Sequence, residues 1–317
     1  MRQGDPLSCP LFDLAIEPLA CLFRKDPEVH GLNIPGLLEK IIIRLFADDT
    51  NLYLSKRDRV DHIQKILEHW CKASGAKFNI DKTEIIPFGT ETYEQRTLTT
   101  RKINQEDQET VPENIRITED GGEAVRILGA WIGNKTEDHT PWENIINKME
   151  EKLTRWEKIH PTLNGRRLIT QAIIGGHTRF LTKAQGMPTK IEETISKMIT
   201  KFIWQDDSSP RIAIDTLQRP LEEGGLNLPN IKHRNEAIEI MWLKEYLNFS
   251  HNRQPWATIT DLIINAVIPQ SESSTSRKTK INPFTQIWNV PTKGPNAERL
   301  NDDIKRMLKT AKNTEQT

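Results

Sequence analysis

Two adjacent carboxylates, Asp48 and Asp49, are the residues of this sequence whose type and spacing best suit chemistry. Apolar runs rich in β-branched residues lie on both sides of the pair, at residues 40–45 and 50–54. Such runs predict two strands joined by a tight turn, with the acids at its tip. A hairpin tip can hold a divalent metal through carboxylate oxygens, but Asp is also common in turns because its side chain bonds its own backbone. The residue types alone leave both interpretations open.

Three further motifs accompany the acids in a fixed order. They are RQGDPLS at residues 2–8, GAKFNIDKT at 75–83 and ILGAWIG at 127–133. Together with FADD at 46–49, this series resembles the reverse transcriptases of LINE-type (non-LTR) retrotransposons, from palm motif B through motifs C, D and E. The resemblance continues to about residue 250. It implies an RNA-directed DNA polymerase that extends a DNA primer on an RNA template with deoxynucleotides.

In that family the chemistry is phosphoryl transfer by two metal ions, and the resemblance implies Mg²⁺. Asp48 would be the direct metal ligand from the hairpin, and Asp49 a weaker or indirect one. Lys82 matches the motif D lysine, which faces the nucleotide's phosphates and can serve as the general acid for pyrophosphate. An exposed lysine in a turn before a strand is the plainer interpretation of Lys82, and the residues alone do not decide between the two.

The resemblance also assigns binding roles. The triplet at residues 2–4 would contact the incoming nucleotide and the template, Asn79 would accompany the motif D lysine, and the pair at 128–129 would grip the primer end. These candidates are Arg2, Gln3, Gly4, Asn79, Leu128 and Gly129. The alternatives are a polar tail with a Gly-Asp-Pro turn for the triplet and an edge hairpin containing glycine for the pair.

A basic region follows the four motifs. Residues 141–206 carry eleven bases against seven acids, so their net charge of +4 would suit a nucleic-acid backbone. Arg166 and Arg167 are the bases that we expect to contact phosphates of a template–primer duplex. Solvated faces of ordinary helices would explain the same charge. The tryptophans at helical spacing in this region favour core positions over base-stacking platforms.

One member of the family's catalytic set has no counterpart. The other essential aspartate belongs to motif A, which precedes motif B, and motif B begins here at Arg2. No acid of the sequence can therefore be assigned to motif A. We expect an N-terminally truncated polymerase fragment that binds Mg²⁺ weakly or not at all and extends primers little. The alternative is a non-catalytic nucleic-acid-binding chain or an inert transposon remnant.

The order of the expected strands and helices that position these residues predicts an α+β fold. A partial polymerase palm, a sheet with the catalytic hairpin backed by helices, would be followed by an α-helical thumb. The clearest helix is expected at 57–74, where one apolar stripe ends at Gly75. Pro18 should kink or divide an earlier helix that begins near Ser8. Further elements are expected at 83–88 (a strand) and at 140–156, 166–181, 190–204 and 235–246 (helices).

Composition suggests three parts. Residues 1–135 would form the partial palm, residues 140–250 the thumb-like region, and residues 251–317 a polar, partly disordered C-terminal extension. Within the first part, residues 90–123 have a net charge of −5 and little periodicity, which predicts a mobile insertion.

The remaining composition favours a soluble intracellular protein, in the cytoplasm or the nucleus. Three cysteines lie far apart without zinc-ligand spacing, which fits a reducing compartment. No apolar run approaches the roughly 18–20 residues that span a bilayer, so no membrane partner is expected. The sequence indicates no particular protein partner.

Overall fold

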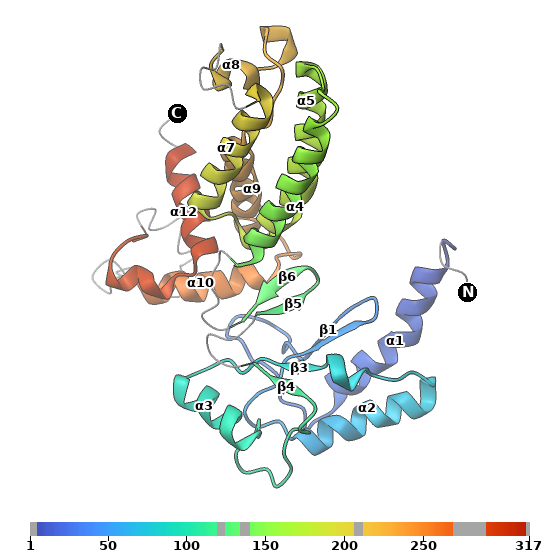
Figure 1. The fold of residues 1–317 in the computed structure, drawn as a ribbon. Helices are drawn as coiled ribbons and strands as arrows, with labels where there is room; N and C mark the ends of the chain where they lie inside the picture. Colours follow the sequence, from blue (N-terminus) through green and yellow to red (C-terminus); the bar gives the residue numbers. More distant parts are fainter. Residues whose placement is uncertain (1–4, 119–123, 134–139, 206–211, 269–289, 315–317) are drawn as a thin grey trace. The chain divides into compact units, whose positions relative to one another are not determined.

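The computed structural model describes residues 5–118, 124–133, 140–205, 212–268 and 290–314 (Figure 1). The chain divides into two compact units, residues 1–136 and 137–317. The first unit contains short strands and helices, and the second is helical in its described part. This mixture of helices and small sheets is compatible with the expected α+β class.

The first unit begins with helix α1 (Ser8–Lys25). Its second half supplies Leu19 and Phe23 to a core that also contains residues from the later strands and helix. Pro18 lies on the exposed side, and α1 continues through it as one helix. Of the two predicted effects of Pro18, division of the helix is therefore wrong, and a kink stays a prediction. Burial of Leu19, Ala20 and Phe23 directly after the proline holds the second half against the core.

The predicted hairpin follows. Strand β1 (Ile43–Phe46) pairs antiparallel with β2 (Asp49–Leu52), and Ile43 lies opposite Leu52. Ile43 is 2% exposed and packs in the core formed with α1 and α2. One face of the hairpin is therefore anchored by apolar burial.

Helix α2 (Val60–Ser74) confirms the clearest sequence prediction. Ile63 and Ile66 are buried, and Leu67 and Trp70 pack against the same core. Gly75 ends the helix with φ of +72°, and its N–H donates to the Cys71 carbonyl at 2.9 Å. A left-handed glycine directly after a helix satisfies a carbonyl that would otherwise lack a partner.

Residues 90–118 of the predicted mobile insertion (90–123) form a helix, a short strand and packed loops, and residues 119–123 lie outside the described residues. Thr90 caps helix α3 (Glu91–Thr100) by accepting a hydrogen bond from Tyr93 N–H. Strand β4 (Arg116–Ile117) pairs parallel with β3 (Glu84–Ile85). Val111 and other apolar residues of this stretch pack on Val60 at the start of α2. Because these apolar residues come from loops and a two-residue strand, they produce no periodic signal.

A second hairpin ends the first unit. Strands β5 (Val125–Ile127) and β6 (Ala130–Ile132) pair antiparallel, with Ile127 opposite Ala130. Each sheet in the described residues has two strands, so these residues do not form the single palm-like sheet of the prediction.

The second unit opens with helices at or near the predicted positions. These are α4 (Thr140–Glu157), α5 (Leu163–Thr170), a π-helical turn (Gln171–Gly175), α6 (Gly176–Gln185) and α7 (Thr189–Trp204). Trp142 and Met149 of α4 and Ile195 of α7 are almost completely buried. The tryptophan nearest the start of this unit is thus a core residue, as expected.

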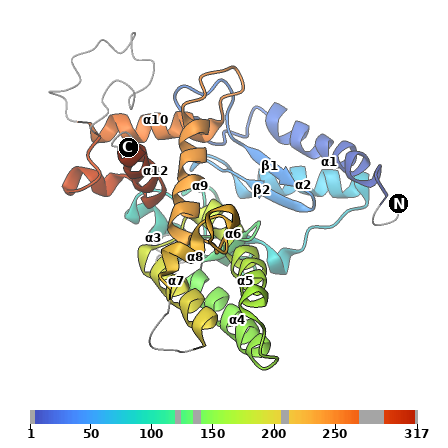
Figure 2. The same ribbon diagram turned by 90° about the horizontal axis from the view of Figure 1, so that it is seen from above.

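The rest of the second unit is also helical. It contains α8 (Ile214–Gln218), α9 (Ile231–Tyr246), α10 (Pro255–Val267) and α12 (Asp302–Thr314). Figure 2 shows α10 and α12 beside α9, and Tyr246, Ile264 and Leu308 from the three helices share one core. Residues 251–317 are therefore no separate polar extension in their described part. The apolar face of α12 was not predicted because these residues are rich in Ser and Lys overall. The expected linker at 271–279 lies outside the described residues.

Candidate active site

Asp48 lies at the tip of the first hairpin. The pairing of Phe46 with Asp49 leaves Ala47 and Asp48 as the two turn residues, as the sequence predicts. Asp48 and Asp49 are both exposed, while Thr50 is half-buried. Both carboxylates can therefore reach solvent, a metal ion or a substrate.

The turn carries backbone strain beside the acid. Ala47 has φ of +50°, in the left-handed region that residues with a Cβ seldom adopt. Two-residue hairpin turns favour positive φ because it matches the twist of the strands. Such a conformation costs on the order of 1 kcal/mol in a non-glycine residue and recurs at functional sites. Sequence reasoning missed this feature because alanine gives no signal for it.

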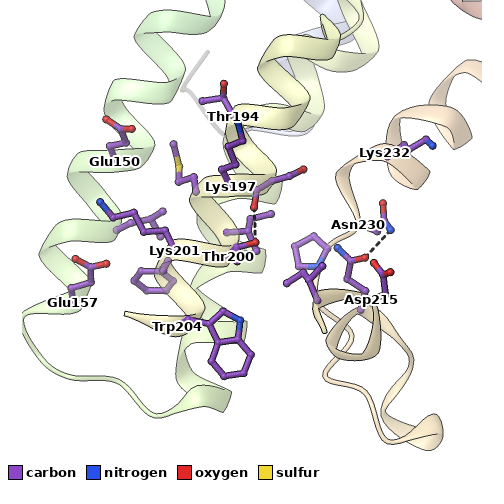
Figure 3. Close-up of a pocket in the computed structure, with 18 of the residues that line it drawn as sticks. Glu150, Glu157, Thr194, Lys197, Thr200, Lys201, Trp204, Asp215, Asn230 and Lys232 are labelled. Carbon is purple, nitrogen blue, oxygen red and sulfur yellow. Dashed lines mark hydrogen bonds between the residues drawn. The ribbon is translucent and has the colours of Figure 1, made fainter. Parts of the chain in front are cut away.

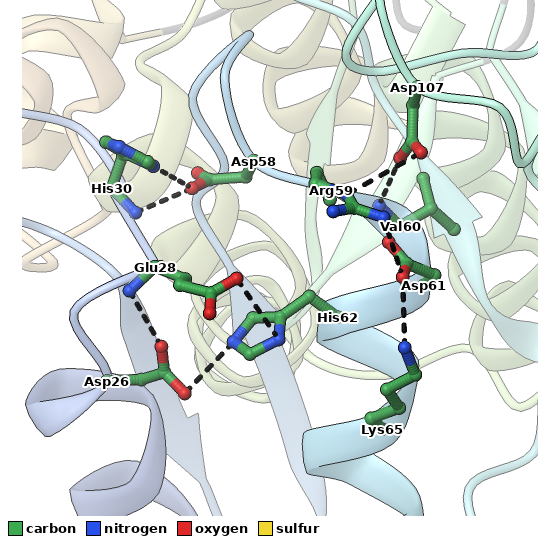
Figure 4. Close-up of polar contacts among 10 residues, drawn as sticks. All are labelled: Asp26, Glu28, His30, Asp58, Arg59, Val60, Asp61, His62, Lys65 and Asp107. Atoms are coloured by element: carbon green, nitrogen blue, oxygen red, sulfur yellow. Dashed lines mark hydrogen bonds and ion pairs between the residues drawn. The ribbon is translucent and has the colours of Figure 1, made fainter.

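Contacts between His62 and two acids hold the loop that leads from α1 toward the hairpin (Figure 4). His62 of α2 places Nε2 3.0 Å from Oδ2 of Asp26 and Nδ1 3.8 Å from Oε2 of Glu28. Burial acts to raise the pKa of Asp26. Hydrogen bonds from His62 and from the backbone N–H of Glu28 outweigh it, so this pKa lies below its usual value.

The motif D candidates lie in a short 3₁₀ helix (Ile80–Lys82) and the residue before it. Lys82 and Asn79 are exposed. The Asn79 carbonyl accepts from Lys82 N–H at 3.2 Å and from the Thr83 hydroxyl at 2.9 Å, which fixes the turn. Their approach to Asp48 stays a prediction. Arg2, Gln3 and Gly4 lie outside the described residues.

The pair at 128–129 forms the tip of the second hairpin. Leu128 has φ of +50° and Gly129 has φ of +87°, so both turn residues are left-handed. Positive φ at both positions is the pattern of a type I′ turn. Leu128 is 43% exposed, so an apolar side chain projects from the tip. The predicted hairpin is confirmed, and its contact with a primer stays a prediction.

Arg166 is buried, which corrects its expected contact with phosphates. Only 3% of it is exposed, and its guanidinium donates to the carbonyls of Pro161 and Phe202. The guanidinium carbon also lies 5.2 Å from the centre of the Phe202 ring, and burial lowers the pKa of Arg166. Arg167 is half-buried and donates to Asn164 at 3.0 Å, and its phosphate contact stays a prediction.

The second unit contains a cavity that the sequence did not indicate. Its volume is about 1030 Å³, and it lies among α4, α7, α8 and the start of α9 (Figure 3). Lys197, Lys201 and Lys232 line it together with the acids of α4 and α8. The indole N–H of Trp204, also in the lining, is buried and has no hydrogen-bond partner in the described part of the chain. In the sequence, the feature that could have indicated this basic lining is the spacing of Lys197 and Lys201, four residues apart on α7.

The donor set for a metal is incomplete. Within the described ranges, no group of three or more His, Cys, Asp and Glu side chains could hold a metal ion. Asp48 and Asp49 are adjacent, exposed carboxylates, which are the oxygen ligands that Mg²⁺ prefers. They fit one side of a metal site.

No described helix is long and apolar enough to cross a membrane.

Two comparisons with known proteins agree with the motif series. Residues 1–131 match the family of reverse transcriptases (RNA-dependent DNA polymerases). The Transposon TX1 uncharacterized 149 kDa protein of Xenopus laevis is 24% identical over 264 residues. That alignment covers 82% of this chain but 18% of the relative, so the chain spans less than a fifth of the relative's length. Over residues 1–131 the chain is therefore similar to reverse transcriptases, and both findings support its resemblance to those of non-LTR retrotransposons.

Proposed function

We propose that this chain supplies palm and thumb parts of an RNA-directed DNA polymerase. Residues 1–131 would form part of the palm, and the helical second unit would act as the thumb. The observation that carries the proposal is the position of Asp48, exposed at the tip of a tight hairpin within the region that matches the family. The substrates would be an RNA template, a DNA primer and deoxynucleotides.

In this proposal Asp48 holds Mg²⁺ directly and Asp49 supports it. Bound metal ions activate the primer hydroxyl and neutralise charge on the leaving pyrophosphate. Two ions about 3.5–4 Å apart need acids from more than one strand, and Asp48 and Asp49 belong to one hairpin. We therefore infer that catalysis needs a further carboxylate, from a strand that this sequence does not contain. Mg²⁺ binding and extension by the chain alone would accordingly be weak or absent.

The surroundings of the hairpin support an additional strand. Among the described strands, β1 and β2 pair only with each other, and isolated two-stranded hairpins are marginal in water. Phe46 of β1 is 64% exposed, and Leu14 in the first half of α1 is 72% exposed. An exposed apolar side chain on a strand with an unpaired edge, as at Phe46, suits a further packed element.

The other candidate residues take roles around this centre. Lys82 would face the nucleotide's phosphates and donate a proton to pyrophosphate. The nucleotide and the template would meet Arg2, Gln3, Gly4 and Asn79. Leu128 and Gly129 would contact the primer end, and Arg167 a backbone phosphate. Arg166 takes no part because its guanidinium is buried and donates to the carbonyls of Pro161 and Phe202.

A primer-extension assay with Mg²⁺ tests the proposal. The chain alone is compared with a longer protein that also contains the motif A strand. We expect extension of a DNA primer on an RNA template by the longer protein only. Robust extension by the chain alone would refute the need for a second strand, and no extension by either would refute the polymerase role.

The lysine-lined cavity of the second unit favours a second candidate, a nucleic-acid-binding chain without catalysis. Lys197 and Lys232 could hold backbone phosphates there, although Glu150, Glu157 and Asp215 in the same lining weaken the attraction. Salt-sensitive binding of duplex that persists when no protein containing this chain extends primers would favour this candidate. An unfolded chain that binds nothing would instead indicate an inert remnant.

A further inference from the structure

The loop before the acidic hairpin and the segment after it meet at one buried carboxylate, that of Asp58 (Figure 4). Its side chain is 1% exposed. Oδ1 accepts a 2.6 Å hydrogen bond from the N–H of His30 and lies 3.1 Å from Nδ1 of that residue. Oδ2 accepts from the N–H groups of Gly31 at 3.0 Å and Ser55 at 2.6 Å. The carboxylate therefore accepts from two segments, from His30 and Gly31 before the hairpin and from Ser55 after it.

These segments adjoin the base of the hairpin. Leu32, next to the donor glycine, exchanges two backbone hydrogen bonds of 2.9 Å with Ile41, two residues before β1. The carbonyl of Ile42 accepts from Tyr53 N–H at 2.7 Å, directly after β2. The donor serine follows two residues later. Asp58 thus joins the segment that borders the first strand to the segment that leaves the second.

The backbone of the loop at Gly31 also packs closely against Ile41 and Ile42, directly before β1. Gly31 has φ of +57°, and a Cβ added there would lie 2.6 Å from Cγ1 of Ile42 and 2.8 Å from the Ile41 carbonyl oxygen. Carbon atoms in ordinary contact are about 3.5–4.0 Å apart, so the loop backbone is too close for a side chain. Movement of this loop would therefore displace the base of the hairpin.

Asp58 is itself held from the other side. Oδ2 of Asp107 accepts from Val60 N–H at 3.1 Å, at the first residue of α2. The side-chain amide of Asn104 donates to the Arg57 carbonyl at 3.2 Å. These contacts on both sides of Asp58 come from a stretch more than 40 residues later in the sequence. The carboxylate therefore has a fixed position from which to hold the hairpin.

We propose that Asp58 is a positioning residue that fixes the acidic hairpin at its base and so gives Asp48 a defined place. This inference rests on the function proposed for Asp48, and Asp58 itself touches neither metal nor substrate. A carboxylate suits this role because both of its oxygens accept hydrogen bonds. Asparagine would turn an NH₂ group toward backbone N–H donors and leave them without an acceptor.

Hydrogen exchange of the whole chain tests the proposal without any need for activity. In Asp58→Asn, we expect amides of residues 30–32, 41–46 and 49–55 to exchange on the order of tenfold faster, with the second half of α2 unchanged. Asp61→Asn is the matched control. Asp61 is also buried, but its side chain pairs with the side chains of Arg59 and Lys65. This control should leave the hairpin amides unchanged.

A second variant keeps the test decisive if Asp58→Asn does not fold. Gly31→Ala retains the carboxylate but pushes the loop against Ile42, and it should accelerate exchange in the same hairpin amides. Unchanged hairpin exchange in the folded variants would overturn the proposal. So would equal acceleration across residues 5–118, because Asp58 would then contribute only general stability.

Kinetics separates this proposal from the proposed function. In a longer protein that extends primers, Asp58→Asn should lower kcat on the order of 10²-fold, because a displacement of about 1 Å can cost that much. The KM for primer–template should stay within about twofold, since binding surfaces are untouched. A rise in KM with unchanged kcat would overturn the positioning role. If no protein extends primers, the polymerase role fails while hydrogen exchange still decides the position of the hairpin.

Discussion

Buried charged side chains in the two units satisfy different kinds of backbone group. In the first unit the buried charged groups include Asp58 and Asp107, whose oxygens accept from backbone N–H groups. In the second unit Arg166 donates to the carbonyls of Pro161 and Phe202, and Arg306 donates to the carbonyl of Gln185. In these examples negative charge serves backbone donors and positive charge serves backbone acceptors. Half-buried Arg101 of the first unit likewise donates to the carbonyls of Val111, Pro112 and Ile115.

The difference follows from the elements of each unit. Loops around a short hairpin, and the start of a helix, leave N–H groups without partners, and a carboxylate satisfies them. Helix ends leave carbonyls without partners, and Phe202 and Gln185 lie in the last turns of α7 and α6. Counting the basic residues of the second unit therefore overstates its capacity to hold phosphates.

The largest stability effect should come from Arg166→Ala. Truncation leaves the buried Phe202 carbonyl and the half-buried Pro161 carbonyl without their charged donor, and we expect the free energy of unfolding to fall by about 3 kcal/mol. Arg167→Ala is the matched control and should change it by less than about 0.5 kcal/mol. Denaturant unfolding measures both. Equal losses in the two variants would contradict the assignment of Arg166 to structure and Arg167 to the surface.

The first unit should show a smaller loss in Asp107→Asn. This change weakens the acceptor of the Val60 N–H at the start of α2, and we expect a loss of about 1–2 kcal/mol. The exposed Glu109 offers a control, because Glu109→Gln removes a nearby charge without a contact to α2. If the control lost as much stability as Asp107→Asn, the effect would be one of net charge and the contrast between the units would fail.

Acid titration examines the buried acid of the second unit. Burial raises the pKa of Glu239, although Arg306 at 3.4 Å opposes the rise. The folded state therefore binds this proton more tightly than the unfolded state, so the contribution of Glu239 to stability decreases as pH rises from about 4.5 through the raised pKa. Glu239→Gln should become more stable relative to the parent over that range. A stability difference that is constant with pH would contradict the raised pKa.

The smallest change in stability is expected for Ala47→Gly, which alters backbone geometry without altering charge. Ala47→Gly removes the cost of a left-handed alanine but adds freedom to the unfolded chain, so we expect a net gain of about 0.5 kcal/mol or less. Leu128→Gly at the second hairpin should behave in the same way. Thermal unfolding of both variants measures this. A clear loss of stability in Ala47→Gly would mean that the Cβ makes contacts which outweigh the strain.

Local patterns predicted the parts of this fold that depend on neighbouring residues. The apolar–acid–apolar run was enough for the hairpin at 43–52, and the stripe that ends at Gly75 was enough for α2. The folded structure of residues 90–118 was not predicted, because it depends on contacts between residues far apart in the sequence. An example is the contact of Asp107 with Val60, 47 residues away.

The candidate site shows the same limit. Asp48 at the turn and the hairpin at 128–129 were predictable because both follow from short sequence patterns. Burial of Arg166 depends on the Phe202 carbonyl, 36 residues away, and no pattern near Arg166 reveals it. Ala47 was missed for a different reason, because its left-handed backbone is imposed by the pairing on both sides.

The central claim is that Asp48 is the metal-binding acid of a polymerase hairpin. Its most direct test is Mg²⁺-dependent primer extension by a longer protein that carries the motif A strand, with and without Asp48→Asn. We expect the substitution to reduce extension by at least about 10³-fold, since it removes a ligand of the ions that stabilise the transition state. Affinity for template–primer should stay within about twofold. Extension that persists in Asp48→Asn at the parent's rate would contradict the claim.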